Sequence, residues 1–352
     1  MRRLEDLRLI TGSGNYAEDA KIPGMLHAGI LRSTYAHALV KSIDLDDLRK
    51  LNGVQAILTS DYVLASSKPF PPLFVPQGLK IPLRFALARN KTTFVGEPLL
   101  AIAAEDRGIA EDALDLVKVE YEPLTPILNP EDALTSKIVI HDDVPQNIYY
   151  HRKIESGDIS NLRNSFFFKE SSFKINRQAA TPLEPRTVLA DYDPLNGHLT
   201  VICTTQIPHV MKMMLSEILG LPLDKVRVIN KDVGGGFGSY KYHFEDIITS
   251  LLSIIAKRPV KWTSTRTENL LGGYHGRDQF HCARIGTDRN GRILGFEDRI
   301  IADIGAYLAR EGVGPAGVTA NLLPGPYDIR NISIELFCVD KQNSSKCIPR
   351  IW

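Results

Sequence analysis

Lys231-Asp-Val-Gly-Gly-Gly-Phe-Gly-Ser239 is a glycine-rich loop between a predicted strand and a predicted helix. The strand is Val226-Arg-Val-Ile-Asn230, and the helix runs from Glu245 to Lys257, acidic at its start and basic at its end. Glycine lets a backbone take positive φ and approach a ligand closely, beside a helix N-terminus that favours anions. The loop therefore predicts either a cofactor site or a tight packing turn.

Two common nucleotide sites do not fit this loop. A dinucleotide fingerprint would need glycine where Ser239 stands, and a P-loop would end in Gly-Lys-Ser/Thr, which is absent. NAD and ATP are therefore disfavoured. Phe237 would project an aromatic ring from an otherwise bare loop, which suits the wall of an apolar pocket better than a phosphate cradle.

Size and composition indicate an ordinary globular protein. The chain has 352 residues and 39.2 kDa, enough for two or three domains, and its 42 basic and 41 acidic side chains show no bias toward nucleic acid or an anionic membrane. The cysteines form no C-x-x-C pair, so neither a disulfide framework nor an iron–sulfur or zinc site is indicated. The four are Cys203, Cys282, Cys338 and Cys347.

The charged N-terminal sequence and the lack of long apolar stretches favour a cytoplasmic protein. The start, Met1-Arg-Arg-Leu-Glu-Asp, is too charged for a signal peptide. No stretch approaches the roughly 20 apolar residues of a membrane span. We therefore expect a cytoplasmic protein with no membrane span and no nucleic-acid partner.

Alternating strand and helix patterns predict an α+β fold in two domains. Residues 1–125 form the first, with strands such as Leu99-Leu-Ala-Ile-Ala-Ala104 and a helix from Ala110. Residues 126–165 carry several prolines and little periodicity, which predicts a surface linker. Residues 166–339 form the second domain, and 340–352 form a polar, patternless tail.

Six motifs in order resemble the large, molybdopterin-binding subunit of molybdenum hydroxylases of the xanthine oxidase family, of the aldehyde oxidase and carbon monoxide dehydrogenase type. Three are typical of its α/β hammerhead domain and three of the first part of its molybdopterin-binding α/β domain. They are Arg3-Leu-Glu-Asp-Leu-Arg-Leu-Ile-Thr-Gly, Arg32-Ser-x-x-Ala-His, Val95-Gly-Glu-Pro, Gln178-x-x-x-Pro-Leu-Glu-Pro-Arg, Thr205-Gln-x-Pro-His and Asp232-Val-Gly-Gly-Gly-Phe-Gly.

The resemblance implies which residues hold the cofactor. Gln206 would approach the molybdenum, and the loop would pack against metal and pterin through Gly234, Gly235, Gly236, Phe237 and Gly238. The family binds its metal through pterin sulfurs, so no side chain here is expected to ligate it directly. The sequence departs from the family where Tyr240 precedes Lys241.

For the other polar residues, the sequence predicts structural or surface roles or leaves the role undecided. His209, His243, His275 and His281 lack the spacing of a metal site, so we expect structural or surface roles. Glu184 and Arg186 could form an internal ion pair or line the substrate funnel.

The tail from Asp340 to Trp352 is expected to be out of frame. Codons compatible with it, read one nucleotide later, encode Thr-Asn-Lys-Thr-Pro-Ala-Ser-Ala-Tyr-Arg-Gly, which resembles the family's segment at this point. The family's catalytic glutamate base would then lie beyond the truncation, and no catalytic residue is assigned. Strand 332–339 would lose its neighbours and expose an apolar edge.

The resemblance implies a molybdenum-dependent oxidoreductase. The chain would be the N-terminal part of a subunit that hydroxylates aldehydes, carbon monoxide or N-heterocycles with water-derived oxygen, using molybdopterin cytosine dinucleotide. Its partners would be an FAD-binding medium subunit, a [2Fe-2S] small subunit and a separately encoded C-terminal part. The alternatives are an inactive fragment that only binds partners or cofactor, and an unrelated nucleotide-binding module.

Overall fold

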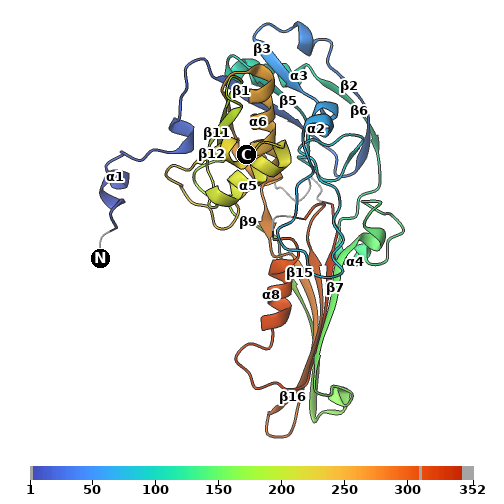
Figure 1. Ribbon diagram of the computed structural model, residues 1–352. Coiled ribbons are helices and arrows are strands. Elements are labelled where there is room, and N and C mark those ends of the chain that lie inside the picture. The colour runs from blue at the N-terminus through green and yellow to red at the C-terminus, as the bar shows by residue number, and fades with distance from the viewer. Residues whose placement is uncertain (1–2, 309–310, 343–352) are drawn as a thin grey trace. The chain divides into compact units, whose positions relative to one another are not determined.

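The computed structural model describes residues 3–308 and 311–342, and the chain divides into two compact units (Figure 1). Unit 1 combines Met1–Phe70, Arg84–Leu124 and Ala180–Tyr274. Unit 2 combines Pro71–Leu83, Thr125–Ala179 and His275–Trp352. Among the described residues no helix is long and apolar enough to cross a membrane.

Unit 1 is built around a seven-stranded mixed sheet. Its two parallel pairs are β1 with β13 and β11 with β12, and the other neighbours are antiparallel. In spatial order the strands are β12 (Val226–Ile229), β11 (His198–Cys203), β10 (Thr187–Asp193), β13 (Val260–Thr263), β1 (Leu26–Arg32), β5 (Pro98–Ala104) and β3 (Val54–Leu58).

One strand pair joins the two predicted domains within this sheet. Leu26 of β1 lies opposite Val260 of β13, so strands from residues 1–125 and from 166–339 share one sheet. Parallel pairing between such distant strands leaves no local sequence signal. The compact units are therefore discontinuous along the chain.

Unit 1 also contains a smaller sheet and several helices. The smaller sheet has β2 between β4 and β6, so β4 and β6 are its edge strands. The bounds are β2 (Ala38–Asp44), β4 (Lys91–Thr92), β6 (Lys118–Pro123), α1 (Asp6–Ile10), α2 (Ser60–Ser66), α3 (Arg107–Asp115), α5 (Pro208–Leu219), α6 (Phe244–Ala256) and α7 (Arg266–Gly272).

Helix α6 is the buried helix that the sequence predicts after the glycine-rich loop. Its residues from Phe244 to Ser253 are all buried, including the ionisable Glu245 and Asp246. The helix ends at Ala256, and the capping residue after it, Lys257, takes the left-handed conformation at φ 51°. Because burying a charge is costly unless it is paired, the acidic start of α6 needs partners inside the unit.

Unit 2 contains a five-stranded sheet and one longer helix. In spatial order the strands are β7 (Ile148–Ser156), β17 (Ile332–Val339), β16 (Ile293–Asp303), β15 (Gln279–Thr287) and β8 (Phe167–Ile175). Helix α8 (Gly314–Leu322) packs on one face through Ala316 and Ala320 (Figure 1). The other elements are β9 (Gln178–Ala179), β14 (His275–Gly276) and α4 (Pro130–Ala133).

The predicted exposed edge at 332–339 is wrong. β17 lies inside the sheet, parallel to β16 on one side and antiparallel to β7 on the other, and Leu336 and Cys338 are fully buried. A strand supplied from residues before 165 covers it, which local periodicity could not show. The edges of the sheet are formed by β7 and β8 instead.

The predicted linker also needs correction. Residues 126–165 contain α4 and the nine-residue strand β7, which pairs with β17 from Ile332 to Val339. The expected out-of-frame tail lies outside the described residues from 343 onward. Its first residues are described: Asp340 N–H donates to the Asn147 carbonyl at 2.8 Å, and Lys341 Nζ lies 2.7 Å from Asp278 Oδ2.

Candidate functional site

Gln206 holds the C-terminal end of the glycine-rich loop. It stands between β11 and α5, and its Oε1 accepts the N–H groups of Gly238 at 3.0 Å and Tyr240 at 3.3 Å. Its own N–H donates to the Tyr240 carbonyl at 2.8 Å. With Oε1 committed to the loop, the exposed amide group of Gln206 offers its Nε2 hydrogens to a ligand.

Glu184 contacts both ends of the same loop, at Gly234 and at Tyr240. Its Oε2 accepts the Gly234 N–H at 2.6 Å, and its Oε1 accepts the Thr204 hydroxyl at 3.0 Å. The Tyr240 hydroxyl donates to the Glu184 carbonyl. Burial raises the pKa of the Glu184 carboxyl, although the Gly234 N–H and the Thr204 hydroxyl oppose that shift.

Two loop glycines leave no room for a side chain. A Cβ on Gly236 would lie 2.4 Å from Gln206 Cδ, and one on Gly234 would lie 2.6 Å from Glu184 Cβ. Gly235 and Gly238 have φ of +104° and +83°, which favours glycine. The loop backbone therefore lies directly on the two side chains that hold it.

The loop contains unused backbone donors. In the described part of the chain, the N–H groups of Gly235, Gly236 and Phe237 have no hydrogen-bond partner, and Gly236 is buried while Phe237 is exposed. Phe237 takes φ 49°, in the left-handed region, and its side chain is 78% exposed. Successive free N–H groups of this kind bind anionic or oxygen-bearing groups.

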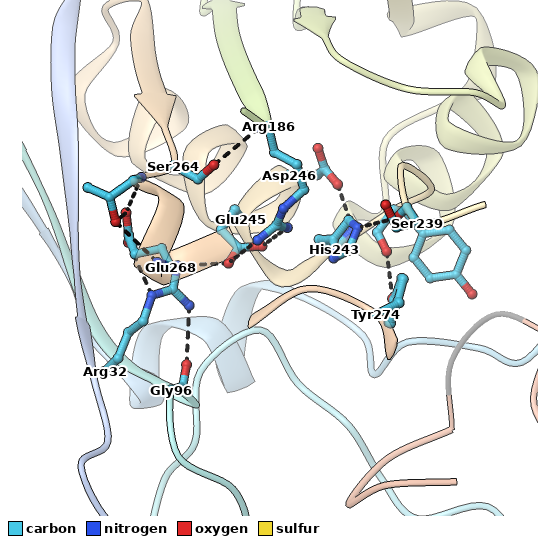
Figure 2. Close-up of polar contacts among 12 residues, drawn as sticks. Arg32, Gly96, Arg186, Ser239, His243, Glu245, Asp246, Ser264, Glu268 and Tyr274 are labelled. Atoms are coloured by element: carbon cyan, nitrogen blue, oxygen red, sulfur yellow. Dashed lines mark hydrogen bonds and ion pairs between the residues drawn. The ribbon is translucent and has the colours of Figure 1, made fainter. Parts of the chain in front are cut away.

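His243 braces the loop from the start of α6. Its Nε2 donates to the Ser239 carbonyl at 2.8 Å (Figure 2). The Ser239 hydroxyl donates to the Gly236 carbonyl at 2.9 Å. Its ring stacks on Tyr274 with centroids 4.3 Å apart. Burial lowers the pKa of His243 well below its ordinary value, so the imidazole is neutral and keeps the proton on Nε2.

A buried ion network lies at the same end of α6. Glu245 accepts from Arg186 Nη1 and from Arg32 Nη2, both at 2.8 Å (Figure 2). Arg32 Nε also lies 3.1 Å from Glu268 Oε1 on α7. The side chains of Glu245, Arg186 and Arg32 are 1%, 5% and 8% exposed, so the charges neutralise one another away from water.

Opposing charges keep Glu245 ionised. Burial alone would raise the pKa of this carboxyl, but Arg186 and Arg32 outweigh it and hold the pKa well below its ordinary value. Both guanidinium groups also lie over the Trp262 ring, at 5.3 and 5.9 Å from its centroid. The network ties β1, α7 and the residue before β10 to α6, the helix that follows the loop.

The neighbouring carboxyl, Asp246, should make stability depend on pH. Burial raises its pKa to about 7, from an ordinary 3.8, although the His243 N–H opposes this. The folded chain therefore retains a proton that the unfolded chain loses above pH 3.8, so this contribution to stability is lost as pH rises toward about 7.

Asp246→Asn isolates that effect, since asparagine can still accept the His243 N–H. We expect the difference in unfolding free energy, variant minus wild type, to increase from about pH 4 to about pH 7 and then level off. Urea denaturation at several pH values measures it. A difference that does not change across this range would contradict the buried, protonated carboxyl.

Glu184→Ala should loosen the glycine-rich loop. It removes a charged acceptor worth about 1.5–3 kcal/mol, so we expect the Gly234 amide to exchange its hydrogen roughly 10- to 100-fold faster. Glu184→Gln keeps an acceptor of the same shape and should retain most of the protection. Equal exchange in the alanine variant and the wild type would show that Glu184 does not hold the loop.

The start of the loop is held from the N-terminal segment. Asp232 accepts the Arg8 guanidinium, and its Oδ2 accepts the Asn15 N–H at 2.8 Å. The Arg8 guanidinium and then the Asn15 N–H lower the pKa of Asp232 to about 2. Segments more than two hundred positions apart in sequence are thereby joined at the loop.

The donor set at the loop fits a cofactor that carries oxygen atoms. The free N–H groups of residues 235–237 and the Gln206 amide all donate, and no described group of three His, Cys, Asp or Glu side chains could hold a metal ion. This donor set fits the cofactor that the sequence resemblance implies, in which pterin sulfurs hold the metal.

Known families match both halves of the chain. Residues 140–350 match the molybdopterin cofactor-binding domain, and residues 11–125 match the a/b hammerhead domain of aldehyde oxidase and xanthine dehydrogenase. The chain belongs to the molybdenum hydroxylase large-subunit family. Its α+β fold, with a hammerhead part and a molybdopterin-binding part, is confirmed.

Individual molybdenum hydroxylases align along almost the whole chain. It is 35% identical to the nicotine 6-hydroxylase large subunit of Paenarthrobacter nicotinovorans, covering 93% of this chain and 41% of that one. It is 30% identical to the nicotinate dehydrogenase large molybdopterin subunit of Eubacterium barkeri, covering 95% and 76%. Quinoline 2-oxidoreductase from Pseudomonas putida 86 has the same fold, with TM-score 0.94, 32% identity, and coverage of 98% and 44%.

The chain spans about two fifths of the length of most of the large subunits it matches. The Eubacterium barkeri relative is shorter, and this chain spans 76% of it.

The predicted site residues of this molybdenum hydroxylase chain lie together. Gln206 contacts the loop that carries Gly234, Gly235, Gly236, Phe237 and Gly238. Their contact with cofactor remains a prediction. Glu184 and Arg186, left open by the sequence, have different partners: Glu184 accepts from Gly234, and Arg186 pairs with Glu245.

Sequence reasoning missed the residues that brace the loop. His243 was expected to be structural or on the surface, and its contact with Ser239 could not be foreseen from metal-site spacing. Tyr240, which breaks the family pattern, is buried and hydrogen-bonds the Glu184 carbonyl. Tyr240 therefore joins the C-terminal end of the loop to the residue that accepts the Gly234 N–H.

Proposed function

We propose that this chain is the cofactor-holding N-terminal part of the catalytic large subunit of a molybdenum hydroxylase. The enzyme would hydroxylate aldehydes, carbon monoxide or N-heterocycles with oxygen derived from water. The observation that carries the proposal is the glycine-rich loop, held on Gln206 and Glu184 with three free N–H groups. The names of the relatives, nicotine 6-hydroxylase and quinoline 2-oxidoreductase, favour an N-heterocycle.

The proposed cofactor is molybdopterin cytosine dinucleotide. When bound, its molybdenum accepts the electrons of the oxidation and supplies the oxygen that is transferred. Gln206 would donate its Nε2 hydrogens to the cofactor, and Gly235, Gly236 and Phe237 would donate backbone N–H groups to it. Gly234 and Gly238 would keep the loop in shape, and the exposed Phe237 ring would form an apolar wall for the substrate.

The proposed partners are an FAD-binding medium subunit and a [2Fe-2S] small subunit, which would carry electrons away from the cofactor. A separate chain would supply the C-terminal part of the large subunit, including the catalytic base. The short Eubacterium barkeri relative, 76% of which this chain spans, supports a large subunit made from two chains. The cytoplasm is the proposed location.

Co-expression tests this proposal. The chain would be produced alone and together with its proposed partner chains, and the complex would be assayed for oxidation of nicotinate, quinoline, an aldehyde and carbon monoxide with an artificial electron acceptor. We expect turnover only in the complete complex, and oxygen-18 from labelled water in the product. Product oxygen derived from dioxygen would contradict the proposal.

The second candidate is a fragment that binds partners or cofactor without turnover. Cofactor retention without turnover in the complete complex would support this candidate. Bound nucleotide without molybdenum would instead support a nucleotide-binding module.

A further inference from the structure

Arg84 is a buried cation surrounded by aromatic rings in unit 1. The residue is only 6% exposed. Its guanidinium carbon lies 3.9 Å from the ring centroid of Phe244, 4.9 Å from that of Phe70 and 5.7 Å from that of Tyr274. The face of an aromatic ring attracts a cation, and the attraction is stronger away from water. These contacts hold the guanidinium group at Phe244, the first residue of α6, close behind the glycine-rich loop.

A hydrogen bond links the same guanidinium group to Tyr274. Arg84 Nη1 donates to the Tyr274 hydroxyl at 3.4 Å, and that hydroxyl donates to the Tyr242 carbonyl at 2.7 Å. The Phe70 N–H donates to the Arg84 carbonyl at 2.8 Å, which ties the backbone of the arginine to the same aromatic cluster. Successive hydrogen bonds polarise and strengthen one another. Arg84 therefore stabilises one position of the Tyr274 ring and hydroxyl.

Tyr274 in turn contacts the residue that braces the glycine-rich loop. Its ring stacks on His243 with centroids 4.3 Å apart and planes 25° from parallel. His243 is 3% exposed, and its Nε2 donates to the Ser239 carbonyl at 2.8 Å. In a close-packed interior an imidazole ring can turn away from its acceptor only when its neighbours move. The position of Tyr274 thus keeps His243 directed at the loop.

We propose that Arg84 is a positioning residue for the glycine-rich loop and acts through Tyr274 and His243. Arg84 holds the Tyr274 ring, Tyr274 holds the plane of the imidazole, and the imidazole holds the end of the loop at Ser239. The positioning of the loop stands on these contacts alone. The further step, that Arg84 thereby supports cofactor binding, rests on the proposed function.

A guanidinium group is a costly way to fill space in the core. Burying a charge costs free energy that an apolar side chain of similar length does not. Methionine would fill much of the same volume, but it could not donate to the Tyr274 hydroxyl or attract three ring faces. Arg84→Met therefore separates a positioning role from simple packing.

Exchange of the His243 ring proton tests the role in the full chain. With nitrogen-15-labelled histidine we expect a protected Nε2–H signal, assigned by its loss in His243→Gln. In Arg84→Met this proton should exchange with water about threefold to tenfold faster, the effect of weakening one neutral hydrogen bond. Unchanged exchange in the folded variant would overturn the proposal.

Arg89→Met is the matched control. The Arg89 side chain is more than half exposed and pairs with Asp61, so its loss should leave the His243 ring proton unchanged. The Ala110 amide, which donates to the Asp106 carbonyl on α3, reports any general loss of stability. Equal acceleration of the Ala110 amide and the His243 ring proton in Arg84→Met would indicate general destabilisation and overturn the positioning role.

Tyr274→Phe tests the intermediate step and remains informative if Arg84→Met does not fold. The phenylalanine ring can still stack on His243, but it offers no hydroxyl to Arg84 or to the Tyr242 carbonyl. We expect faster exchange of the His243 ring proton, and adding Arg84→Met should change it less than Arg84→Met does alone. Wild-type exchange in Tyr274→Phe, or full additivity of the two changes, would exclude Tyr274 as the link.

Cofactor content distinguishes this inference from the proposed function. In the co-expressed complex we expect Arg84→Met to retain about threefold less molybdenum and pterin than Arg89→Met, in line with the weakened loop contact. A wild-type complex without molybdenum would contradict the proposed function and leave the exchange result standing. Equal molybdenum in both variants of a loaded complex would overturn the link between Arg84 and the cofactor.

Discussion

Replacing Glu245 with alanine is expected to lower the free energy of unfolding by about 3–5 kcal/mol. The carboxylate is 1% exposed and neutralises Arg186 and Arg32, so its removal leaves two guanidinium groups buried without their main counter-ion. Leaving a buried charge uncompensated costs far more than the pair itself contributes.

Denaturant unfolding followed by Trp262 fluorescence measures this loss. Trp262 is buried and lies beneath both guanidinium groups, and a Trp352→Phe background removes the other tryptophan signal. Glu111→Ala is the control, because Glu111 pairs with the half-exposed Arg107 on α3 and should cost under about 1 kcal/mol. A similar loss in the two variants would contradict the buried network.

Gly236→Ala is expected to reduce retained cofactor about tenfold or more. The new Cβ would lie 2.4 Å from Gln206 Cδ and 2.6 Å from its Oε1, so the Gln206 side chain must move. That movement breaks its hydrogen bonds to Gly238 and Tyr240, and overpacking of this kind costs roughly 1–3 kcal/mol. Molybdenum and pterin per chain, measured in the co-expressed complex, report the loss.

Hydrogen exchange separates the loop from the cofactor. In the chain alone, Gly236→Ala should speed exchange of the Gly238 amide, and adding Gln206→Ala should change it little further, because both changes act through one contact. Gly317→Ala, where a Cβ meets nothing within 4 Å, should leave this amide unaffected. Additive effects of the two loop changes would contradict the shared contact.

The elements with strong local patterns could be predicted from the sequence. The apolar run of β5 and the helix boundaries of α6 gave their positions, since periodicity and helix boundaries are local properties. The composition of the glycine-rich loop also indicated a close approach of backbone to another group, which the contacts of Gly234 and Gly236 confirm.

Long-range pairing could not be predicted. Arg32 and Glu245 are 213 positions apart, and nothing near either residue indicates the other. The same limit explains β7, which looked like a linker because its burial comes from β17, far along the chain. Residues that hold the site through distant partners, such as Glu184 and His243, fall in this class.

The most direct test of the cofactor cradle is the molybdenum and pterin content of this chain, purified from cells that also make its proposed partners. We predict close to one molybdenum and one pterin per chain, both lost together in Gln206→Ala and Glu184→Ala variants that remain folded. Wild-type chain that carries no molybdenum under these conditions, or folded variants that retain it fully, would contradict the proposed role of the loop.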